Sequence, residues 1–111
     1  MRVISQDGTM DVPYEISSFS MAVGKYENVE HAVIFCYNYS TSMGTKMAEY
    51  GSKEKAKKAM EMLRIAYGNN EFYHHISNSE HFTEFVKALG EEMSKKATTE
   101  YFQFPTEEEL E

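Results

Sequence analysis

The chain has 111 residues, of which 41% are hydrophobic, and a formal net charge of −7. This length fits one domain with a modest core, and the apolar content excludes an intrinsically disordered chain. The acidic balance disfavours binding to duplex nucleic acid, which needs a basic surface. Apolar runs are too short to cross a membrane or to form a targeting peptide, and Cys36 has no second cysteine for a disulfide. We therefore expect a cytoplasmic protein without a membrane partner.

The first part of the chain predicts an antiparallel hairpin. Residues 2–5 form a short strand, and Asp7-Gly8 favours a tight turn because glycine accepts a positive φ. The return segment covers residues 10–16, where Pro13 lacks an amide donor and so marks an edge or a bend. Strand character continues over 14–23, with a break at Ser17-Ser18, and residues 24–28 are expected to turn.

The most apolar segment, residues 31–39, predicts a central strand. Cys36 lies within this strand, and we interpret it as a small buried core residue because a nucleophilic cysteine needs exposure and a neighbouring base. A loop is expected at 40–44. It is followed by an antiparallel strand at 45–50.

Two helices are expected after these strands. Ser52 is placed to cap an amphipathic helix over residues 53–67, which the segment 68–70 should end. A second helix begins near Ser77, where the serine and Glu80 fit a capping box.

The ending combines aromatic residues with acidic ones. Residues 101–105 form either an added strand or a tail packed against a partner, and the glutamates after them should be solvated. The expected fold is α+β: one antiparallel sheet of about four strands followed by two helices. It forms a single domain over 1–105 with an acidic tail over 106–111. Since two helices leave part of such a sheet uncovered, we expect a homodimer or a higher homo-oligomer.

No residue pattern predicts an enzyme, a cofactor or a metal site. The histidine pair His74-His75 has no cysteine or carboxylate at a zinc-ligand spacing, so loop histidines are the preferred interpretation. Glu91 and Glu92 are neighbours on a helix surface, and the glycines form no phosphate-binding motif. We therefore expect a binding protein with no catalytic residue.

Two features favour binding of a nucleotide. Lys57 and Arg64 lie on the basic side of the first helix and are candidates to contact phosphate. Tyr67, Phe102 and Phe104 are candidates to stack against a base. Each feature has an ordinary alternative, since the basic side can be a solvated surface balanced by glutamates and the aromatic rings can pack in the core or at a dimer contact.

Three stretches resemble a group of small proteins encoded by phages and prophages of Firmicutes. They are the opening 1–15 (beginning MRVISQDG), one middle stretch made up of 48–56 and 60–67, and the ending 102–105 with its acidic run, about half of the chain in all. In the order of its elements, the chain is also similar to the anti-Thoeris nucleotide sponges of phages. Those proteins bind cyclic ADP-ribose-type immune signals at a dimer interface without cleaving them. This chain departs from them in having few arginines, Arg2 and Arg64, where sponges commonly clamp phosphates with arginine.

The resemblance implies a non-catalytic phage counter-defence protein. It would act in the host cytoplasm and sequester a nucleotide signal, of the cyclic ADP-ribose type or a cyclic oligonucleotide, at a subunit interface. An alternative is an acidic interaction protein that mimics the charge of nucleic acid and inhibits a host defence protein. A small scaffold protein of mobile-element replication is a further alternative.

Overall fold

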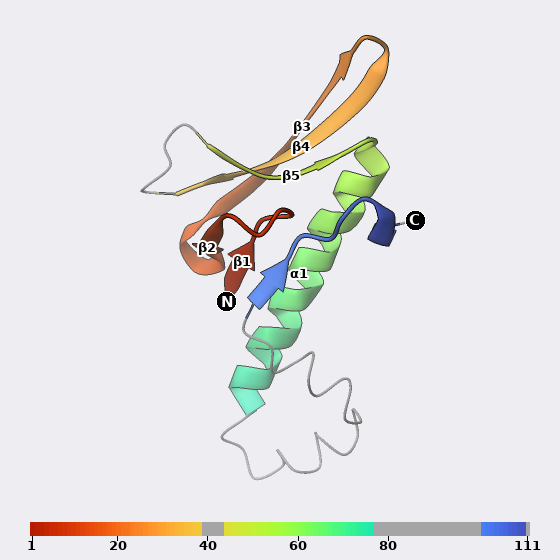
Figure 1. Ribbon diagram of the computed structural model, residues 1–111. Coiled ribbons are helices and arrows are strands. Elements are labelled where there is room, and N and C mark those ends of the chain that lie inside the picture. Colours follow the sequence, from red (N-terminus) through yellow and green to blue (C-terminus); the bar gives the residue numbers. More distant parts are fainter. Residues whose placement is uncertain (39–43, 77–100, 111) are drawn as a thin grey trace.

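The computed structural model describes residues 1–38, 44–76 and 101–110, which form two small sheets and one long helix (Figure 1). The sheet orders are β2-β1-β6 and β3-β4-β5. The elements are β1 (Arg2–Ile4), β2 (Asp11–Pro13), the 3-10 turn η1 (Tyr14–Ile16), β3 (Ser18–Tyr26), β4 (Val29–Tyr37), β5 (Thr45–Tyr50), α1 (Lys53–Ile76), β6 (Tyr101–Gln103) and the 3-10 turn η2 (Glu108–Leu110).

The mixed α+β class is confirmed, but the single sheet of about four strands was wrong. The strands divide between two three-stranded sheets, because η1 follows Pro13 and separates β2 from β3. One helix lies in the described part of the chain, and the second helix expected from Ser77 lies outside it.

The larger sheet is a long β3–β4 hairpin extended by β5. Its two strands pair without interruption from Ser18↔Tyr37 to Tyr26↔Val29. The turn consists of Glu27 and Asn28, with φ values of 51° and 65°. Two positive φ values are typical of a turn that matches the strand twist. The expected turn at 24–28 was therefore placed too early, because Gly24 is a paired strand residue.

The smaller sheet brings the two ends of the chain together. The Asp7-Gly8 turn is confirmed, with Gly8 at φ 78°, and β2 is an edge strand as Pro13 predicts. On the other side of β1, β6 adds in parallel, with Val3 opposite Phe102. Of the two alternatives for the aromatic ending, the added strand is confirmed.

The helix begins where predicted and continues beyond its predicted end. The Ser52 hydroxyl accepts a hydrogen bond from the Lys55 amide at 3.2 Å, so the predicted cap is confirmed. The end at 68–70 was wrong, because α1 continues through Gly68 to Ile76. A glycine inside a helix costs about 1 kcal/mol, and that penalty does not stop a helix of 24 residues.

The core lies between α1 and one face of the larger sheet. Ala56 and Leu63 of α1 are buried together with Ile34 and Cys36 of β4. Cys36 is fully buried, as predicted. Small alanine side chains on α1 let the helix approach the strands closely, and the core continues to the smaller sheet through Val3.

Part of the acidic ending packs against the domain, whereas Glu108 and Glu109 are exposed, as expected of solvated glutamates. The Glu107 carboxylate accepts a hydrogen bond from the Gly51 amide at 2.7 Å and lies 3.3 Å from the Lys55 ammonium. Leu110, in η2, is buried, and its carbonyl accepts a hydrogen bond from Lys58. One apolar residue and one well-placed carboxylate thus attach this segment beside the first turns of α1 (Figure 1).

Candidate functional site

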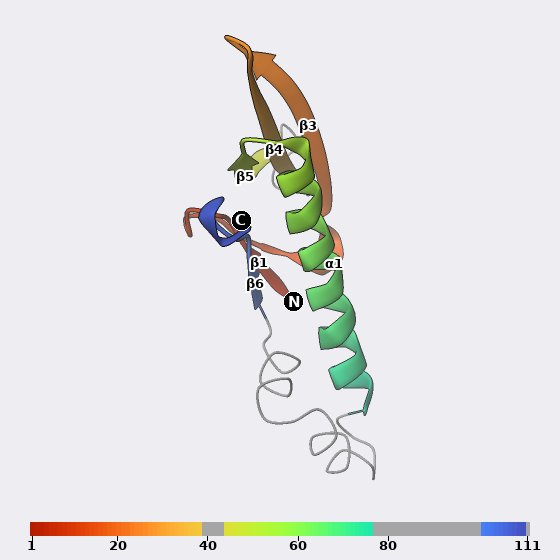
Figure 2. The ribbon, with the colours of Figure 1, turned by 90° about the vertical axis from the view of Figure 1, so that its right-hand side faces the viewer.

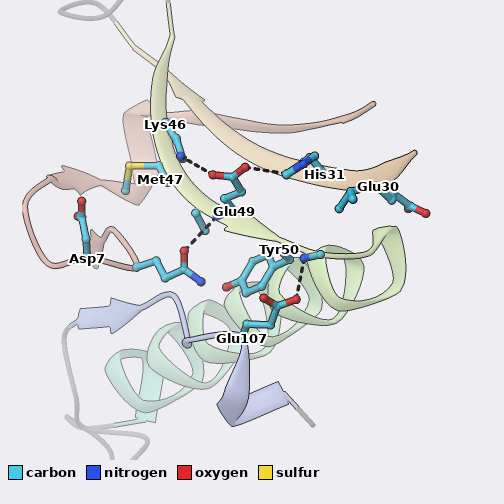
Figure 3. A pocket seen from close by; sticks show the side chains of 12 residues that line it. Asp7, Glu30, His31, Lys46, Met47, Glu49, Tyr50 and Glu107 are labelled. Carbon is cyan, nitrogen blue, oxygen red and sulfur yellow. Dashed lines mark hydrogen bonds and ion pairs between the residues drawn. The ribbon is translucent and has the colours of Figure 1, made fainter. Parts of the chain in front are cut away.

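An acidic groove of about 690 Å³ lies between the two sheets (Figure 3). The turn after β1, the first residues of β4, strand β5 and the segment after β6 form its walls. We define the acidic groove by its charged residues, which are Asp7, Glu30, His31, Lys46, Glu49 and Glu107.

The carboxylates of the acidic groove are held by neighbouring groups. Glu49 bonds Lys46 at 2.6 Å and His31 at 3.1 Å, and these contacts, Lys46 first, lower the pKa of Glu49. Glu30 accepts a hydrogen bond from the Lys53 amide at 2.8 Å. The Gly51 amide and then Lys55 lower the pKa of Glu107. The groove is therefore anionic at neutral pH, so it repels phosphate and favours an amine or a guanidinium.

Asp7, on one wall of this groove, makes the stability of the protein depend on pH. Its carboxylate accepts hydrogen bonds from the Thr9 and Ser5 hydroxyls and the Thr9 amide, which lower its pKa from 3.8 to about 2. A depressed pKa means that the stabilisation is complete above the unfolded pKa and is lost as pH falls through about 2. We expect Asp7→Asn to unfold at lower urea concentrations than the native chain at pH 7, with the difference shrinking between pH 4 and pH 2. A difference that stays constant over that range would contradict this origin of the stabilisation.

A second cavity, of about 390 Å³, lies between α1 and the segment that links the two sheets. We call it the Arg64 cavity. Tyr67 stacks on Tyr14 there, with ring centroids 4.0 Å apart and planes 24° from parallel. The lining residues are Tyr14, Glu15, Ser17, Phe19, Met60, Leu63, Arg64 and Tyr67.

Arg64 is the cation of this cavity. Its side chain is exposed, and within residues 1–38, 44–76 and 101–110 its guanidinium forms no hydrogen bond or ion pair. The nearby carboxylate Glu15 is paired with the amino group of Met1. Desolvation, followed by Glu71 and Glu15, raises the pKa of Tyr67, and one of these effects is a hydrogen bond of the Tyr67 hydroxyl to Glu71. The cavity therefore offers an aromatic stack beside a guanidinium that is unpaired among the described residues.

The structure brings together two of the five predicted ligand-binding residues. Arg64 and Tyr67 line one cavity. Lys57 is exposed seven residues earlier on α1, about 10 Å along the helix, and does not line it. Phe104 is buried and contacts Phe102 edge-to-face, with centroids 5.4 Å apart. For these two phenylalanines the structure favours the packing alternative.

Sequence reasoning missed the partner surface of the cavity. Tyr14, Glu15 and Phe19 come from η1 and β3, more than forty residues before Arg64. A strand was expected over 14–23, and a strand would have directed Tyr14 and Glu15 to opposite faces. The available signal was Pro13, which ends β2 and lets the chain turn back toward α1.

Two further observations limit the chemistry of the described residues. No three histidine, cysteine or carboxylate side chains gather there in a way that would hold a metal ion. Within the same residues, no helix is long and apolar enough to span a membrane.

The protein thus has a mixed α+β fold and two candidate sites, the anionic groove and the cavity that contains Arg64. Comparisons with protein-family models, curated proteins and solved structures find no match for this chain. The resemblance to phage proteins therefore stays a prediction.

Proposed function

We propose that this protein is a non-catalytic phage counter-defence protein that binds and sequesters a nucleotide immune signal. The ligand class is a cyclic ADP-ribose-type molecule or a cyclic oligonucleotide. The observation that carries the proposal is that one cavity holds both the Tyr67–Tyr14 stack and the Arg64 guanidinium, which has no partner within the part of the chain that the structure describes.

Each part of a nucleotide has a complementary group in the Arg64 cavity. A guanidinium binds phosphate through paired hydrogen bonds, which a lysine cannot reproduce. A base can stack against aromatic rings such as Tyr14 and Tyr67 that line the cavity, a contact worth about 1–3 kcal/mol. Phe19, Met60 and Leu63 give the cavity an apolar wall.

The size of the cavity fits this ligand class. Small-molecule sites have volumes of roughly 300–1,000 Å³, and the Arg64 cavity, at about 390 Å³, lies near the lower end of this range. The geometry favours a site within one chain, whereas the resemblance to sponges implies a site between subunits. The described lining includes no histidine or cysteine, and the Ser17 hydroxyl donates to the Pro13 carbonyl at 2.6 Å. This lining favours binding without turnover.

The test is a comparison of Arg64→Ala with Lys57→Ala. Titration calorimetry would use cyclic ADP-ribose, ADP-ribose and a cyclic dinucleotide as probes. We expect Arg64→Ala to weaken binding of the recognised probe by about tenfold to 150-fold, because a hydrogen bond to a charged group contributes roughly 1.5–3 kcal/mol. Lys57→Ala removes an exposed cation of the same helix outside the cavity and should leave affinity within about twofold. Equal affinity of Arg64→Ala and the native chain would overturn the assignment of Arg64.

The acidic groove favours a second candidate, an acidic interaction protein that imitates the charge of nucleic acid. Asp7, Glu30 and Glu107 are among the residues that line this groove (Figure 3), and such an acidic surface suits a lysine or arginine of a host defence protein. This candidate ranks second because its carboxylates are already engaged in holding the loops around the groove.

A further inference from the structure

The Arg64 cavity is lined by few charged side chains, and their number limits the charge of the phosphate that it can bind. Among the described residues that line it, Arg64 has the only cationic side chain and Glu15 the only carboxylate. The arginine belongs to α1 and the glutamate to η1. Because the ligand class proposed above includes phosphates of different charge, these two residues distinguish between its members.

Glu15 is an anion in the folded chain. Its carboxylate accepts a hydrogen bond from the amino group of Met1, and this contact lowers the pKa of Glu15. The Tyr14 amide donates to the Met1 carbonyl at 2.9 Å, and both ribbon views place the N-terminus near the middle of α1 (Figures 1 and 2). The Met1 amine and the Glu15 carboxylate therefore form a neutral pair at the wall of the cavity.

The cavity is left with one positive charge for a ligand, that of Arg64. After desolvation and Glu71, the charge of Glu15 is the next cause that raises the pKa of Tyr67, so this carboxylate lies near the aromatic stack where a base would bind. The next cation on this side of α1, Lys57, is about 10 Å along the helix and does not line the cavity. A second negative charge on the ligand would therefore meet a carboxylate, and the described lining offers it no further cation.

Nucleotide phosphates differ in the charge that they present. A phosphodiester carries a single negative charge, whereas a terminal phosphate carries about −1.5 to −2 at pH 7. The pyrophosphate of cyclic ADP-ribose carries a negative charge on each of its adjacent phosphates. One guanidinium neutralises one charge through paired hydrogen bonds, and a further charge without a partner is unfavourable in a partly desolvated cavity.

On the basis of the nucleotide binding proposed above, we infer that the Arg64 cavity selects a phosphodiester, as in a cyclic nucleotide, over a terminal phosphate or a pyrophosphate. Arg64 binds the diester, and Glu15 is the residue that disfavours a more highly charged phosphate. The volume of about 390 Å³ is near the lower end of the range for small-molecule sites, so one nucleotide unit occupies the cavity. In a cyclic dinucleotide the second unit then lies outside it.

The first test uses the native chain and pairs of probes that differ in phosphate charge. Titration calorimetry at pH 7 would compare cyclic AMP with AMP, cyclic GMP with GMP, and cyclic di-AMP with the linear dinucleotide that carries a terminal phosphate, with cyclic ADP-ribose as the pyrophosphate probe. We expect the diester of the recognised pair to bind at least about tenfold more tightly. Binding of cyclic di-AMP alone would assign the ligand to the dinucleotides, and binding of a cyclic mononucleotide would assign it to the mononucleotides.

Glu15→Gln tests the role of Glu15. The variant removes the negative charge and leaves the Met1 amine without its carboxylate, so a second positive charge becomes available. We expect affinity for the terminal phosphates and for cyclic ADP-ribose to rise about threefold to tenfold, and affinity for the diesters to change less. The control is Glu54→Gln, which removes an exposed carboxylate from the first turn of α1 outside the cavity and should leave every affinity within about twofold.

Two results would overturn the inference and leave the proposed function standing. One is a native chain that binds AMP, GMP or cyclic ADP-ribose as tightly as it binds the diesters. The other is a Glu15→Gln chain that is folded by circular dichroism and keeps the native ratio of affinities. The native comparison needs no variant, so it decides the question if Glu15→Gln does not fold. A native chain that binds no nucleotide would overturn the proposed function, and this inference with it.

Discussion

Phe104→Ala is expected to lower the free energy of unfolding by about 3–5 kcal/mol. The Phe104 side chain is 1% exposed. It contacts Phe19 with ring centroids 6.3 Å apart and Phe102 with centroids 5.4 Å apart. Phe104 directly follows β6, and these contacts join it to β3 of the larger sheet and to β6 of the smaller one, so truncation leaves a cavity between the two sheets. Urea unfolding of the two proteins measures the difference directly.

Tyr101→Ala is the matched control for Phe104→Ala. Tyr101 lies in β6, three residues before Phe104, but it is 53% exposed, and truncating it should change stability by about 0.5 kcal/mol or less. Suppose instead that Phe104→Ala left stability unchanged and abolished nucleotide binding. Phe104 would then be a ligand contact, as the sequence alone had allowed, and the packing account would fail.

Gln6→Ala is expected to cost about 2–3 kcal/mol, although Gln6 is a polar residue in a turn. Its amide oxygen accepts from the Glu49 amide at 3.1 Å, and its amide nitrogen donates to the Pro105 carbonyl at 3.2 Å. One side chain therefore ties the β1–β2 turn to β5 and to the segment after β6. Removing it leaves a backbone donor without its partner beside the acidic groove.

Gln6→Glu separates the two hydrogen bonds of Gln6. The glutamate keeps the acceptor for the Glu49 amide but cannot donate to the Pro105 carbonyl, and it adds a carboxylate to a groove that already holds four. We expect its stability to be lower than that of the native chain at pH 7 and to recover partly as pH falls through the pKa of the new carboxyl. Both variants are measured by urea unfolding. Native stability in Gln6→Ala would show that this bridge contributes nothing.

Local signals in the sequence predicted the elements whose causes are local. The Asp7-Gly8 turn, the Ser52 cap and the apolar strand containing Cys36 depend on a few neighbouring residues. The predictions that failed concern features that depend on residues far away in the sequence. Gly68 is a weak helix breaker that an extended helix overrides, and the third strand of the smaller sheet depends on β6 pairing with β1 across almost the whole chain.

Only the part of the candidate site that lies on α1 could be predicted from the sequence, because only that part depends on neighbouring residues. Arg64 and Tyr67 are three residues apart on one helix, so helical periodicity alone puts them side by side. Tyr14 reaches them through a 3-10 turn that no local pattern announced. Phe102 and Phe104 pack against each other in the structure, and an aromatic residue that fills the core and one that stacks on a base look alike in sequence.

The measurement that tests the central proposal most directly is thermal unfolding of the purified chain against a panel of cyclic nucleotides and ADP-ribose derivatives. A ligand present at about 1,000 times its dissociation constant adds about 4 kcal/mol, which raises the Tm of a domain of this size by on the order of 10 °C or more. We predict such a shift for one ligand class, its loss in Arg64→Ala, and recovery of the ligand unchanged after heating. The absence of a shift with every nucleotide would contradict the proposal and favour a protein partner at the acidic groove.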